Sequence, residues 1–412
     1  MEGCILGEKT LWVISGGIEA VPGIKRAKEM GIHVVVSDLN PDAPGFYFAD
    51  EKIIASTYDI QATLEAAKAY NKKVRPVHGV IAMAADVPMT VAAVAEGLGL
   101  KGISMETACL ASDKLAMKRR FEESNISVPW FSLVESAAHL KRLINERGFP
   151  LIIKPVDSRG ARGVLRIKDN TDLAWAYNYS LKYSPGGRVM AEEYIEGPQI
   201  STESVIFGNR VHTPGFADRN YELLDRFAPF IIENGGHQPS ILSASQQKAV
   251  SSLAENAGRA LGIGSGIAKG DMVMSKNGPV VIEVAARLSG GWFSALQVPL
   301  ATGVDLVGAA IKLALGEELS NDELVKKYQK GVAIRYFFPK PGRVVAIKNV
   351  EQFEKTSWVK MLKIYAKIGD VVEPVTDHTK RAGCVITEGA DRQEAISRAE
   401  EVVDTVAIKT IA

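Results

Sequence analysis

The sequence predicts an α/β protein in three parts: an N-terminal domain with a parallel sheet, a central α+β domain, and a small C-terminal α+β domain. Short apolar strands alternate with helices over residues 10–100, which is typical of a parallel sheet with helices on its faces. From residue 112 onward, hairpins and alternating strands become frequent, as in antiparallel sheets. With 412 residues and about 150 residues per domain, we expect domains at 1–111, 112–316 and 317–412.

The composition excludes several classes of protein. Hydrophobic residues make up 46% and charged residues 24% of the chain, as in a globular protein that buries sizeable cores. The 49 Lys and Arg residues are balanced by 48 Asp and Glu residues, which argues against a nucleic-acid or anionic-membrane partner. No stretch approaches ~18 uninterrupted apolar residues, and the N-terminus has no signal-peptide pattern. Three distant cysteines, Cys4, Cys109 and Cys384, fit a reducing cytoplasm better than a disulfide framework or a zinc cluster.

The N-terminal elements follow from hydrophobic periodicity and from glycines at their ends. The sequence predicts strands at 11–15, 33–37 and 80–84, and helices at 18–30 and 90–98. Ligands of parallel sheets bind at the carboxyl ends of the strands. The residues at these ends are Gly16, Gly17, Asp38 and Asp86.

The turn after the first strand is the place to look for a dinucleotide site. It reads Ser-Gly-Gly-Ile-Glu-Ala-Val-Pro-Gly, which lacks the spaced glycine triplet, and Glu19 would face the pyrophosphate. Asp38 ends the second strand, as a ribose-binding acid would, but acids at strand ends are common. A scaffold or substrate-binding role is therefore favoured over NAD binding.

A glycine-containing loop in the central domain is a candidate for phosphate binding. No Walker-type loop occurs; instead, Ser158-Arg159-Gly160-Ala161-Arg162-Gly163 joins two predicted strands, at 151–154 and 164–167. Small residues let backbone N–H groups turn toward an anion, and the arginines add charge. Lys154 ends the buried strand before the loop, where a lysine is costly without an anionic partner. Each feature alone also fits a simple hairpin, whereas together they favour an anion site.

A basic helix precedes this loop in the sequence. We expect it at 112–123, with Ser112 as its N-cap. Lys114 lies in its first turn and is either a solvated helix residue or a second cation for the anion site.

Two further strands carry a pair of carboxylates. The segments 271–274 and 280–284 are predicted to form a hairpin. If its loop is Asn277-Gly278, Glu283 opposes Met272; if it is Lys276-Asn277-Gly278, Glu283 lies directly opposite Asp271. The second register places the β-carbons of two acids ~5 Å apart, where they repel unless a hard cation such as Mg²⁺ lies between them. The alternative is a solvated hairpin with one exposed acid on each arm.

Other candidate residues lie close to this hairpin in the sequence. Arg287 shares the face of Glu283 if the strand continues, and the following Ser-Gly-Gly offers backbone donors to a phosphoryl group or a carboxylate. Trp292 and Phe293 suggest a partly apolar substrate. His237 lies in a polar loop, where a lone histidine is more often solvated than functional.

These motifs follow one another in a set order. Ser112-Asp113-Lys114 comes first, then Ile152-Ile153-Lys154-Pro155 with its glycine loop, then Glu192-Glu193-Tyr194-Ile195, Asp271, and Ile282-Glu283 with Arg287. In this order and spacing, nearly the whole chain resembles the ATP-grasp superfamily. It is most similar to the carboxylate–amine ligase branch, which includes L-amino-acid ligases and enzymes like biotin carboxylase and carbamoyl-phosphate synthase.

The resemblance implies a nucleotide site. Two lysines would bind the α- and β-phosphates of ATP, and the glycine loop would close over the β- and γ-phosphates. The first glutamate of the Glu-Glu-Tyr-Ile segment would accept a hydrogen bond from the adenine amino group, with backbone groups on the ring edge. The residues so implied are Lys114, Lys154, Ser158, Arg159, Gly160, Gly163, Glu192, Glu193, Ile195 and Gln199.

The same resemblance implies metal-binding and catalytic residues. Asp271 and Glu283 would hold Mg²⁺, with Mn²⁺ as an alternative ion. The catalytic residues would be Arg287 and Lys154, at the phosphoryl group, and His237, in a segment that approaches the substrate. Arg335 is a candidate for binding a substrate carboxylate, or else a salt-bridged strand residue.

Two positions depart from the family pattern. Gln199 stands where the family usually has a glutamate for the ribose hydroxyls; it still forms hydrogen bonds but carries no charge. Ala285 stands where an asparagine usually follows the second metal-binding glutamate, so a ligand for a second Mg²⁺ is missing or comes from elsewhere. Binding of ATP with one metal ion is compatible with both departures, and the two-metal arrangement is open.

The resemblance implies an ATP-dependent carboxylate–amine (or carboxylate–thiol) ligase. ATP would phosphorylate the carboxylate of an amino acid or small acid, and an amine would then displace phosphate from the acyl phosphate. A homodimer is what the family suggests. Three alternatives stay open: a bicarbonate-activating enzyme of the purine or carbamoyl type, a non-catalytic ATP-binding module, and an NAD-dependent enzyme.

Replacing one carboxylate of the hairpin tests the metal assignment. We predict that Glu283→Ala abolishes ATP turnover while the protein stays folded, because only the charge compensation of Mg²⁺ is lost. Nucleotide turnover with substrates and circular dichroism check the two parts of this prediction. Normal turnover by the variant would show that the hairpin is not the metal site.

Overall fold

The computed structural model describes residues 9–411 and contains four sheets. The N-terminal sheet is parallel, in the strand order β3-β2-β1-β4. Its strands are β1 (Thr10–Ile14), β2 (His33–Asp38), β3 (Glu51–Ile54) and β4 (Gly79–Ala82). The helices of this region are η2 (Ile18–Ala20), α1 (Val21–Glu29), η3 (Pro44–Tyr47), α2 (Ile60–Lys73), α3 (Pro88–Gly97) and α4 (Met105–Ser112). The structure thus confirms the predicted parallel sheet.

The largest sheet has eight antiparallel strands, in the order β13-β12-β9-β10-β11-β14-β18-β16. These strands are β9 (Gln199–Phe207), β10 (Arg210–Arg219), β11 (Gly236–Gln238), β12 (Ser265–Ser275), β13 (Gly278–Ala285), β14 (Gly331–Tyr336), β16 (Val359–Ile364) and β18 (Gly383–Gly389). The sheet therefore runs without a break from the central into the C-terminal part of the chain. The predicted domain limits stay a proposal.

Two smaller antiparallel sheets complete the fold. One has the order β5-β8-β6-β7, and its strands are β5 (Phe131–Val134), β6 (Leu151–Pro155), β7 (Leu165–Ile167) and β8 (Val189–Glu193). The other has the order β17-β15-β19, and its strands are β15 (Gly342–Lys348), β17 (Val371–Val372) and β19 (Ala407–Ile411). The remaining helices are α5 (Lys114–Glu123), α6 (Ala137–Arg147), α7 (Leu173–Lys182), α8 (Ala244–Ala260), η4 (Phe293–Gln297), α9 (Val298–Thr302), α10 (Leu306–Ala314), η5 (Asn321–Leu324), η6 (His378–Lys380) and α11 (Arg392–Thr405).

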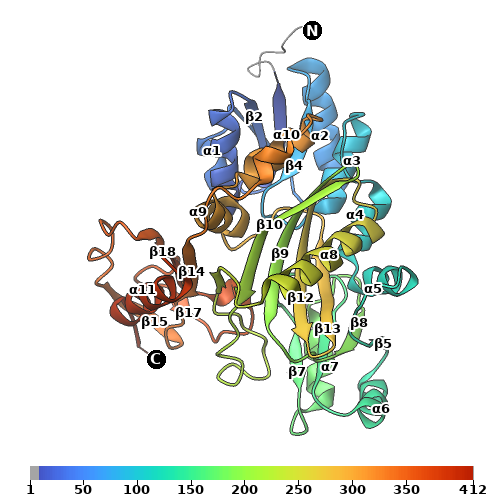
Figure 1. The fold of residues 1–412 in the computed structure, drawn as a ribbon, viewed down its shortest axis with the longest axis vertical. Coiled ribbons are helices and arrows are strands. Elements are labelled where there is room, and N and C mark those ends of the chain that lie inside the picture. The colour runs from blue at the N-terminus through green and yellow to red at the C-terminus, as the bar shows by residue number, and fades with distance from the viewer. Residues whose placement is uncertain (1–8, 412) are drawn as a thin grey trace.

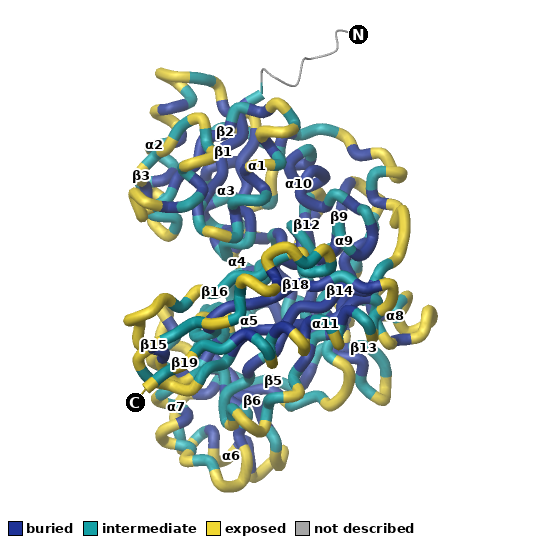
Figure 2. Tube along the Cα trace, turned by 90° about the vertical axis from the view of Figure 1, so that its left-hand side faces the viewer, coloured by how far each residue is buried: buried dark blue, intermediate teal, exposed yellow. Residues whose placement is uncertain are grey.

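Helices cover the sheets and fix how the parts meet. Helix α8 packs on β12 and β13, and α11 packs on β14 and β18 (Figure 1). Helix α10 joins the N-terminal sheet to the large one, since Val13 of β1, Ile311 of α10 and Val205 of β9 belong to one buried cluster. Figure 2 shows central strands such as β1, β14 and β18 as dark, buried tube, whereas outer loops are exposed. The shared core explains why the N-terminal strand ends face the central part of the chain.

One local expectation, the cap of the basic helix, was wrong. Ser112 does not cap the basic helix: it ends α4 and donates its hydroxyl to the carbonyl of Ala108 at 2.8 Å. Asp113 is the N-cap of α5, because its carboxylate accepts the N–H groups of Leu115 and Ala116 at 3.0 and 2.9 Å. Near the C-terminus, helix α11 ends at Thr405, and the chain continues as edge strand β19 against β15.

The turn after β1 closes on its own residues. The Asp38 carboxylate accepts the N–H groups of Gly16 and Asn40 at 2.8 and 2.9 Å, and the hydroxyl of Ser15 at 3.3 Å. These hydrogen bonds occupy the Asp38 carboxylate and hold the loop, which agrees with the expected scaffold role.

The structure tests only in part the expectations about the cysteines, a signal peptide and membrane-spanning segments. Cys109 and Cys384 are free thiols, whereas Cys4 and most of the segment examined for a signal peptide lie outside the described residues. Within residues 9–411, none of the helices has the length and apolar character needed to cross a membrane.

A buried hydrogen bond in the N-terminal sheet provides a test of the fold. The indole N–H of Trp12 donates to the hydroxyl of Ser37 at 3.0 Å, and both residues are fully buried. We predict that Ser37→Ala lowers the free energy of unfolding by about 1–3 kcal/mol, because the indole N–H loses its partner. Ser245→Ala, the same change at an exposed position of α8, is the control, and urea unfolding measures both. Equal stability of the two variants would contradict the prediction.

Candidate active site

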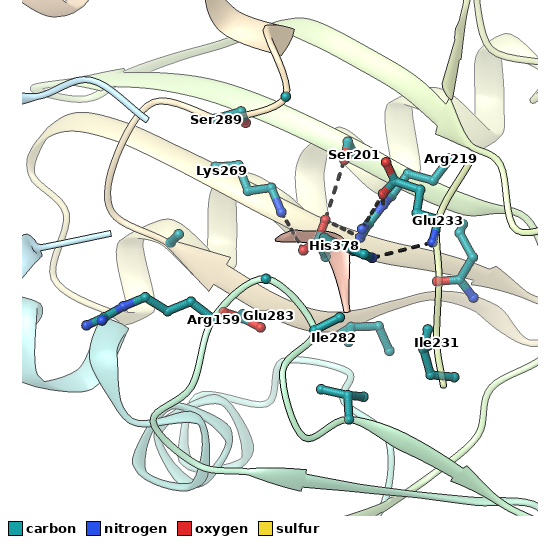
Figure 3. Close-up of a pocket in the computed structure, with 18 of the residues that line it drawn as sticks. Arg159, Ser201, Arg219, Ile231, Glu233, Lys269, Ile282, Glu283, Ser289 and His378 are labelled. Carbon is teal, nitrogen blue, oxygen red and sulfur yellow. Dashed lines mark hydrogen bonds and ion pairs between the residues drawn. The ribbon is translucent and has the colours of Figure 1, made fainter. Parts of the chain in front are cut away.

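A single cleft of about 840 Å³ gathers most of the predicted site residues. Its walls come from the β6–β7 loop, β8, β12, β13, the segment after β13, and the C-terminal part of the chain (Figure 3). The predicted residues that line it are Lys114, Lys154, Ser158, Arg159, Gly160, Glu192, Glu193, Ile195, Gln199, Asp271, Glu283 and Arg287. Gly163, His237 and Arg335 are predicted site residues that do not line it.

Two lysines and one glutamate form a buried cluster at the floor of the cleft, where Lys154 and Glu192 line the cleft and Lys118 lies behind them. The Nζ atoms of Lys154 and Lys118 lie 2.5 and 2.9 Å from the two carboxylate oxygens of Glu192. Burial disfavours the charged carboxylate, but Lys118 and Lys154 outweigh it and lower the pKa of Glu192. Burial lowers the pKa of Lys118 to about 8, against the attraction of Glu192. When both lysines are protonated the cluster carries one excess positive charge, which suits an anionic ligand.

The glycine loop is tied to both sides of the cleft. The Nζ of Lys114 donates to the carbonyl of Ser158 at 2.7 Å, and the carbonyl of Gly160 accepts the N–H of His378 at 3.0 Å. Arg159 reaches Asp86 at 3.4 Å. Gly163 has φ +75°, and a β-carbon there would come 2.8 Å from the side chain of Pro155. Gly163 thus allows the loop to pack, and the loop residues before it face the ligand space.

The hairpin has the register that pairs its two carboxylates, for a different reason than the one predicted. Asp271 lies opposite Glu283. Ser275 pairs with Gly278, so the loop consists of two residues. The extra residue is Ile282, which has no partner in β12 because the register shifts between Asp271 and Met272. The predicted three-residue turn was wrong; a β-bulge produces the same pairing at Asp271.

Basic side chains surround the two carboxylates. Arg219 lies 2.7 Å from Asp271, Lys269 forms an ion pair with it, and the hydroxyl of Ser201 donates to it at 3.4 Å (Figure 3). Burial opposes ionisation of Asp271, but these cations hold its pKa well below the usual value. Glu283 lies 3.4 Å from Lys114 and faces the cleft.

The donor set fits a magnesium ion that binds together with nucleotide phosphates. Mg²⁺ is held by one or two carboxylates when phosphate oxygens and water complete its octahedron. In the part of the chain that the structure describes, no group of three His, Cys, Asp or Glu residues could hold a metal by itself. Ala285, opposite Lys269, adds no donor. Asp271 and Glu283 could therefore hold one ion, while Arg219 and Lys269 compensate the charge of Asp271 in its absence.

Comparison with known families agrees with this geometry. Residues 111–291 match the ATP-grasp domain family, and residues 335–410 match the family described as L-amino acid ligase C-terminal domain 2. The chain therefore contains an ATP-grasp domain.

Individual relatives and structures extend the similarity beyond the matched domains. An uncharacterized protein of Sinorhizobium fredii is 26% identical over 391 residues, which cover 92% of this chain and 79% of that protein. The formate-dependent phosphoribosylglycinamide formyltransferase of Saccharolobus solfataricus is 22% identical over 98% of both chains. The crystal structure of L-amino acid ligase from Bacillus licheniformis has a TM-score of 0.83 at 22% identity and covers 98% of this chain and 99% of that one. At this identity, the structural likeness establishes the fold.

The ATP-grasp cleft holds Arg287 beside an acidic partner from the N-terminal sheet. Its Nε lies 3.2 Å from Asp86, and its terminal nitrogen donates to the carbonyl of Leu288 at 3.0 Å. Burial opposes ionisation of Asp86, but Arg287 and Arg159 together lower its pKa. Arg287 is thus oriented toward the cleft as a charged group.

A buried glutamate supports the loop that follows Arg287. One oxygen of Glu203 accepts the N–H of Ser289 at 2.7 Å, and the hydroxyl of Ser294 lies 2.6 Å from both oxygens. Burial raises the pKa of Glu203 to about 7. Glu203 therefore links strand β9 to the backbone donors of the ATP-grasp cleft.

His237 and Arg335 lie outside the cleft. His237 belongs to strand β11 and is buried, in contrast to the predicted polar loop. Its ring lies 2.5 Å from Arg335 and 3.1 Å from Arg392, and burial together with these two cations lowers its pKa to about 3. Arg335 also contacts Glu400 at 3.4 Å, which corresponds to the salt-bridged alternative. The structure does not bring either residue to the ligand space.

Several residues of the cleft were missed by sequence reasoning. Lys118 had a usable signal, because it lies four residues after Lys114 and hence on the same helix face. Lys269 had a similar sequence signal, because it lies two residues before Asp271 in the same strand. Arg219 and Arg381 reach the site through strand pairing and loop packing between distant segments, for which no local pattern exists.

The pH dependence of stability tests the role of Glu203. A carboxyl whose pKa is raised on folding stabilises the protein fully below the unfolded value of 4.5, and this contribution is lost as the pH rises through about 7. We predict that wild-type stability falls by about 3 kcal/mol more than that of Glu203→Gln between pH 4.5 and 8. Urea unfolding over this pH range measures the difference. Parallel curves for the two proteins would show that Glu203 keeps an ordinary pKa.

Proposed function

We propose that this protein is an ATP-dependent carboxylate–amine ligase that forms an amide through an acyl phosphate and releases ADP and phosphate. The acid is an amino acid or another small carboxylic acid. The match to the ATP-grasp domain family supports the use of ATP, and the geometry of the cleft supports transfer of the γ-phosphoryl group to a carboxylate.

One observation carries the proposal. The carboxylate pair of Asp271 and Glu283 lies in the same cleft as the cations Lys114, Lys154 and Arg287. A pair of acids within a group of cations is the arrangement that a metal–polyphosphate complex requires, since the metal needs carboxylates and the phosphates need positive charge.

The residues of the cleft account for the proposed chemistry. A carboxylate is a poor electrophile, and phosphorylation gives it a leaving group. Lys114, Lys154 and Arg287 would neutralise the charge that develops on the transferred phosphoryl group. The glycine loop, closed against the C-terminal part through Gly160 and His378, would exclude water from the acyl phosphate. Mg²⁺, or Mn²⁺ in its place, would supply further charge compensation at the β- and γ-phosphates.

The adenine end of the cleft supports the remaining nucleotide assignments. Glu193, Ile195 and Gln199 line the cleft, and both carboxylate oxygens of Glu192 form ion pairs with lysines. A hydrogen bond from the adenine amino group to Glu192 would therefore share an oxygen that is already paired. Gln199 would contact the ribose hydroxyls without adding charge.

A bicarbonate-activating enzyme is the second candidate, because the names of several relatives describe related reactions. The cleft argues for a larger acid: Phe293, Tyr336 and Tyr365 contribute aromatic surface to it. Trp292, which the sequence had suggested beside them, is buried behind this wall and donates to the Tyr365 hydroxyl at 3.4 Å.

We also propose a homodimer in the cytoplasm, which light scattering and cell fractionation would test.

Analysis of the nucleotide products tests the proposed function. We predict ADP and phosphate from Mg²⁺-ATP only when certain pools of amino acids or small carboxylic acids are added, because the acid accepts the phosphoryl group. Chromatography of the nucleotides measures this, with the reaction lacking substrates as the control. AMP and pyrophosphate would instead show adenylation. ATP binding without turnover in any pool, including bicarbonate, would favour the non-catalytic module that Ala285 suggests.

A further inference from the structure

Lys118 is a buried cation that lies behind the wall of the cleft. Its side chain is 1% exposed, and it does not line the cleft, whereas Lys154 and Glu192 do. Among residues 9–411, its Nζ atom has no hydrogen-bond partner of regular geometry and a single ion pair, at 2.9 Å to a carboxylate oxygen of Glu192. A buried ammonium group with one partner is costly. Because Lys118 does not reach the ligand space, direct contact with a ligand does not account for it.

Two lysines share the single carboxylate of Glu192. Lys154 occupies one oxygen at 2.5 Å, and Lys118 occupies the other. The side chain of Lys154 also lines the cleft, where the phosphate groups of a nucleotide would compete with Glu192 for its ammonium group. If Lys154 were the sole cation of Glu192, binding of a phosphate would leave a buried carboxylate unpaired, which is strongly unfavourable.

We propose that Lys118 is a positioning residue for nucleotide binding, which keeps Glu192 neutralised so that Lys154 can exchange Glu192 for a phosphate group. The exchange frees the oxygen of Glu192 that Lys154 occupied, and this oxygen becomes available to the adenine amino group. The inference rests on the proposed function, because it requires a nucleotide in the cleft. It adds to the nucleotide site a residue that acts through Glu192 without touching the nucleotide.

The charged groups around Lys118 make its role measurable as a pH dependence. Burial lowers the pKa of Lys118 to about 8, and Lys154 of β6 acts in the same direction. Glu192 of β8 and Glu283 of β13 oppose this change. A nucleotide that takes over Lys154 leaves Glu192 to Lys118 alone, so the protein binds the nucleotide best when Lys118 is protonated. Affinity for the nucleotide should therefore be highest below pH 8 and fall as the pH rises above it.

Binding of MgADP at different pH values tests the inference. We expect the association constant of wild type to fall about tenfold between pH 7 and pH 9, because a group with a pKa of about 8 loses its proton over this range. Lys118→Arg stays charged at both pH values and should show a much smaller fall. Lys141→Arg, the same change at an exposed position of α6, is the control and should follow wild type. Isothermal titration calorimetry measures all three proteins.

Removal of the charge tests the competition for Lys154. We expect Lys118→Met to weaken MgADP binding at pH 7 at least about tenfold, because Glu192 then retains Lys154 as its only cation. In a Glu192→Gln background no carboxylate competes for Lys154, so the same change should have little effect. Thermal unfolding shows whether each variant is folded. If Lys118→Met does not fold, the pH profiles of wild type and Lys118→Arg decide the question.

The outcomes separate this inference from the proposed function. Binding of MgADP with the same pH profile in wild type and Lys118→Arg would overturn the role of Lys118 and leave the proposed function intact. An equal loss of affinity from Lys118→Met with Glu192 and with Gln at that position would overturn it as well, since a purely structural role predicts this result. If wild type binds neither MgADP nor MgATP, the proposed function fails, and the inference fails with it.

Discussion

Every charge that the cleft takes away from water needs an opposite charge or a hydrogen-bond donor, and much of the architecture follows from this requirement. Removing an unpaired carboxylate from water costs several kcal/mol. Glu192 therefore ties α5 to β6 through Lys118 and Lys154. Arg219 and Lys269 do the same for Asp271 within the large sheet. Since all of these pairs except Lys269–Asp271 join different elements, the charges that line the cleft also position its walls.

The continuous eight-stranded sheet explains how a single cleft draws on the whole chain. Strands β12 and β13 lie at one edge and carry the carboxylate pair, whereas β14 and β18 bring the C-terminal segment alongside. The N-terminal sheet is joined through α10, so that Asp86 and Glu19 approach the loop after β13. The proposed acyl-phosphate chemistry would benefit from this construction, because three separate segments enclose one small volume and limit the access of water.

The sequence predicted most of the site but not the local geometry that forms it. Patterns of charge and glycine located the glycine loop and the two lysines of the cleft, because these residues are neighbours along the chain or within one motif. The register of Asp271 with Glu283 was right, although a bulge at Ile282 and not the turn produces it. The cap at Asp113 was missed because Ser112 still belongs to the preceding helix. His237 was placed in a polar loop, since a three-residue strand within a sheet leaves almost no periodic signal.

By itself, the sequence determined the order of the motifs, the parallel N-terminal sheet and the kinds of side chain available for phosphate and metal. These properties depend on residues that are close along the chain, where hydrophobic periodicity and spacing act directly. The tertiary structure alone decided which charges are compensated. Asp271 is paired by Arg219, whereas Glu19 lies between the N-terminal turn and Gly291 and forms no ion pair among residues 9–411. Ion pairs of this kind join segments tens to hundreds of residues apart, and they exist only once the sheets have packed.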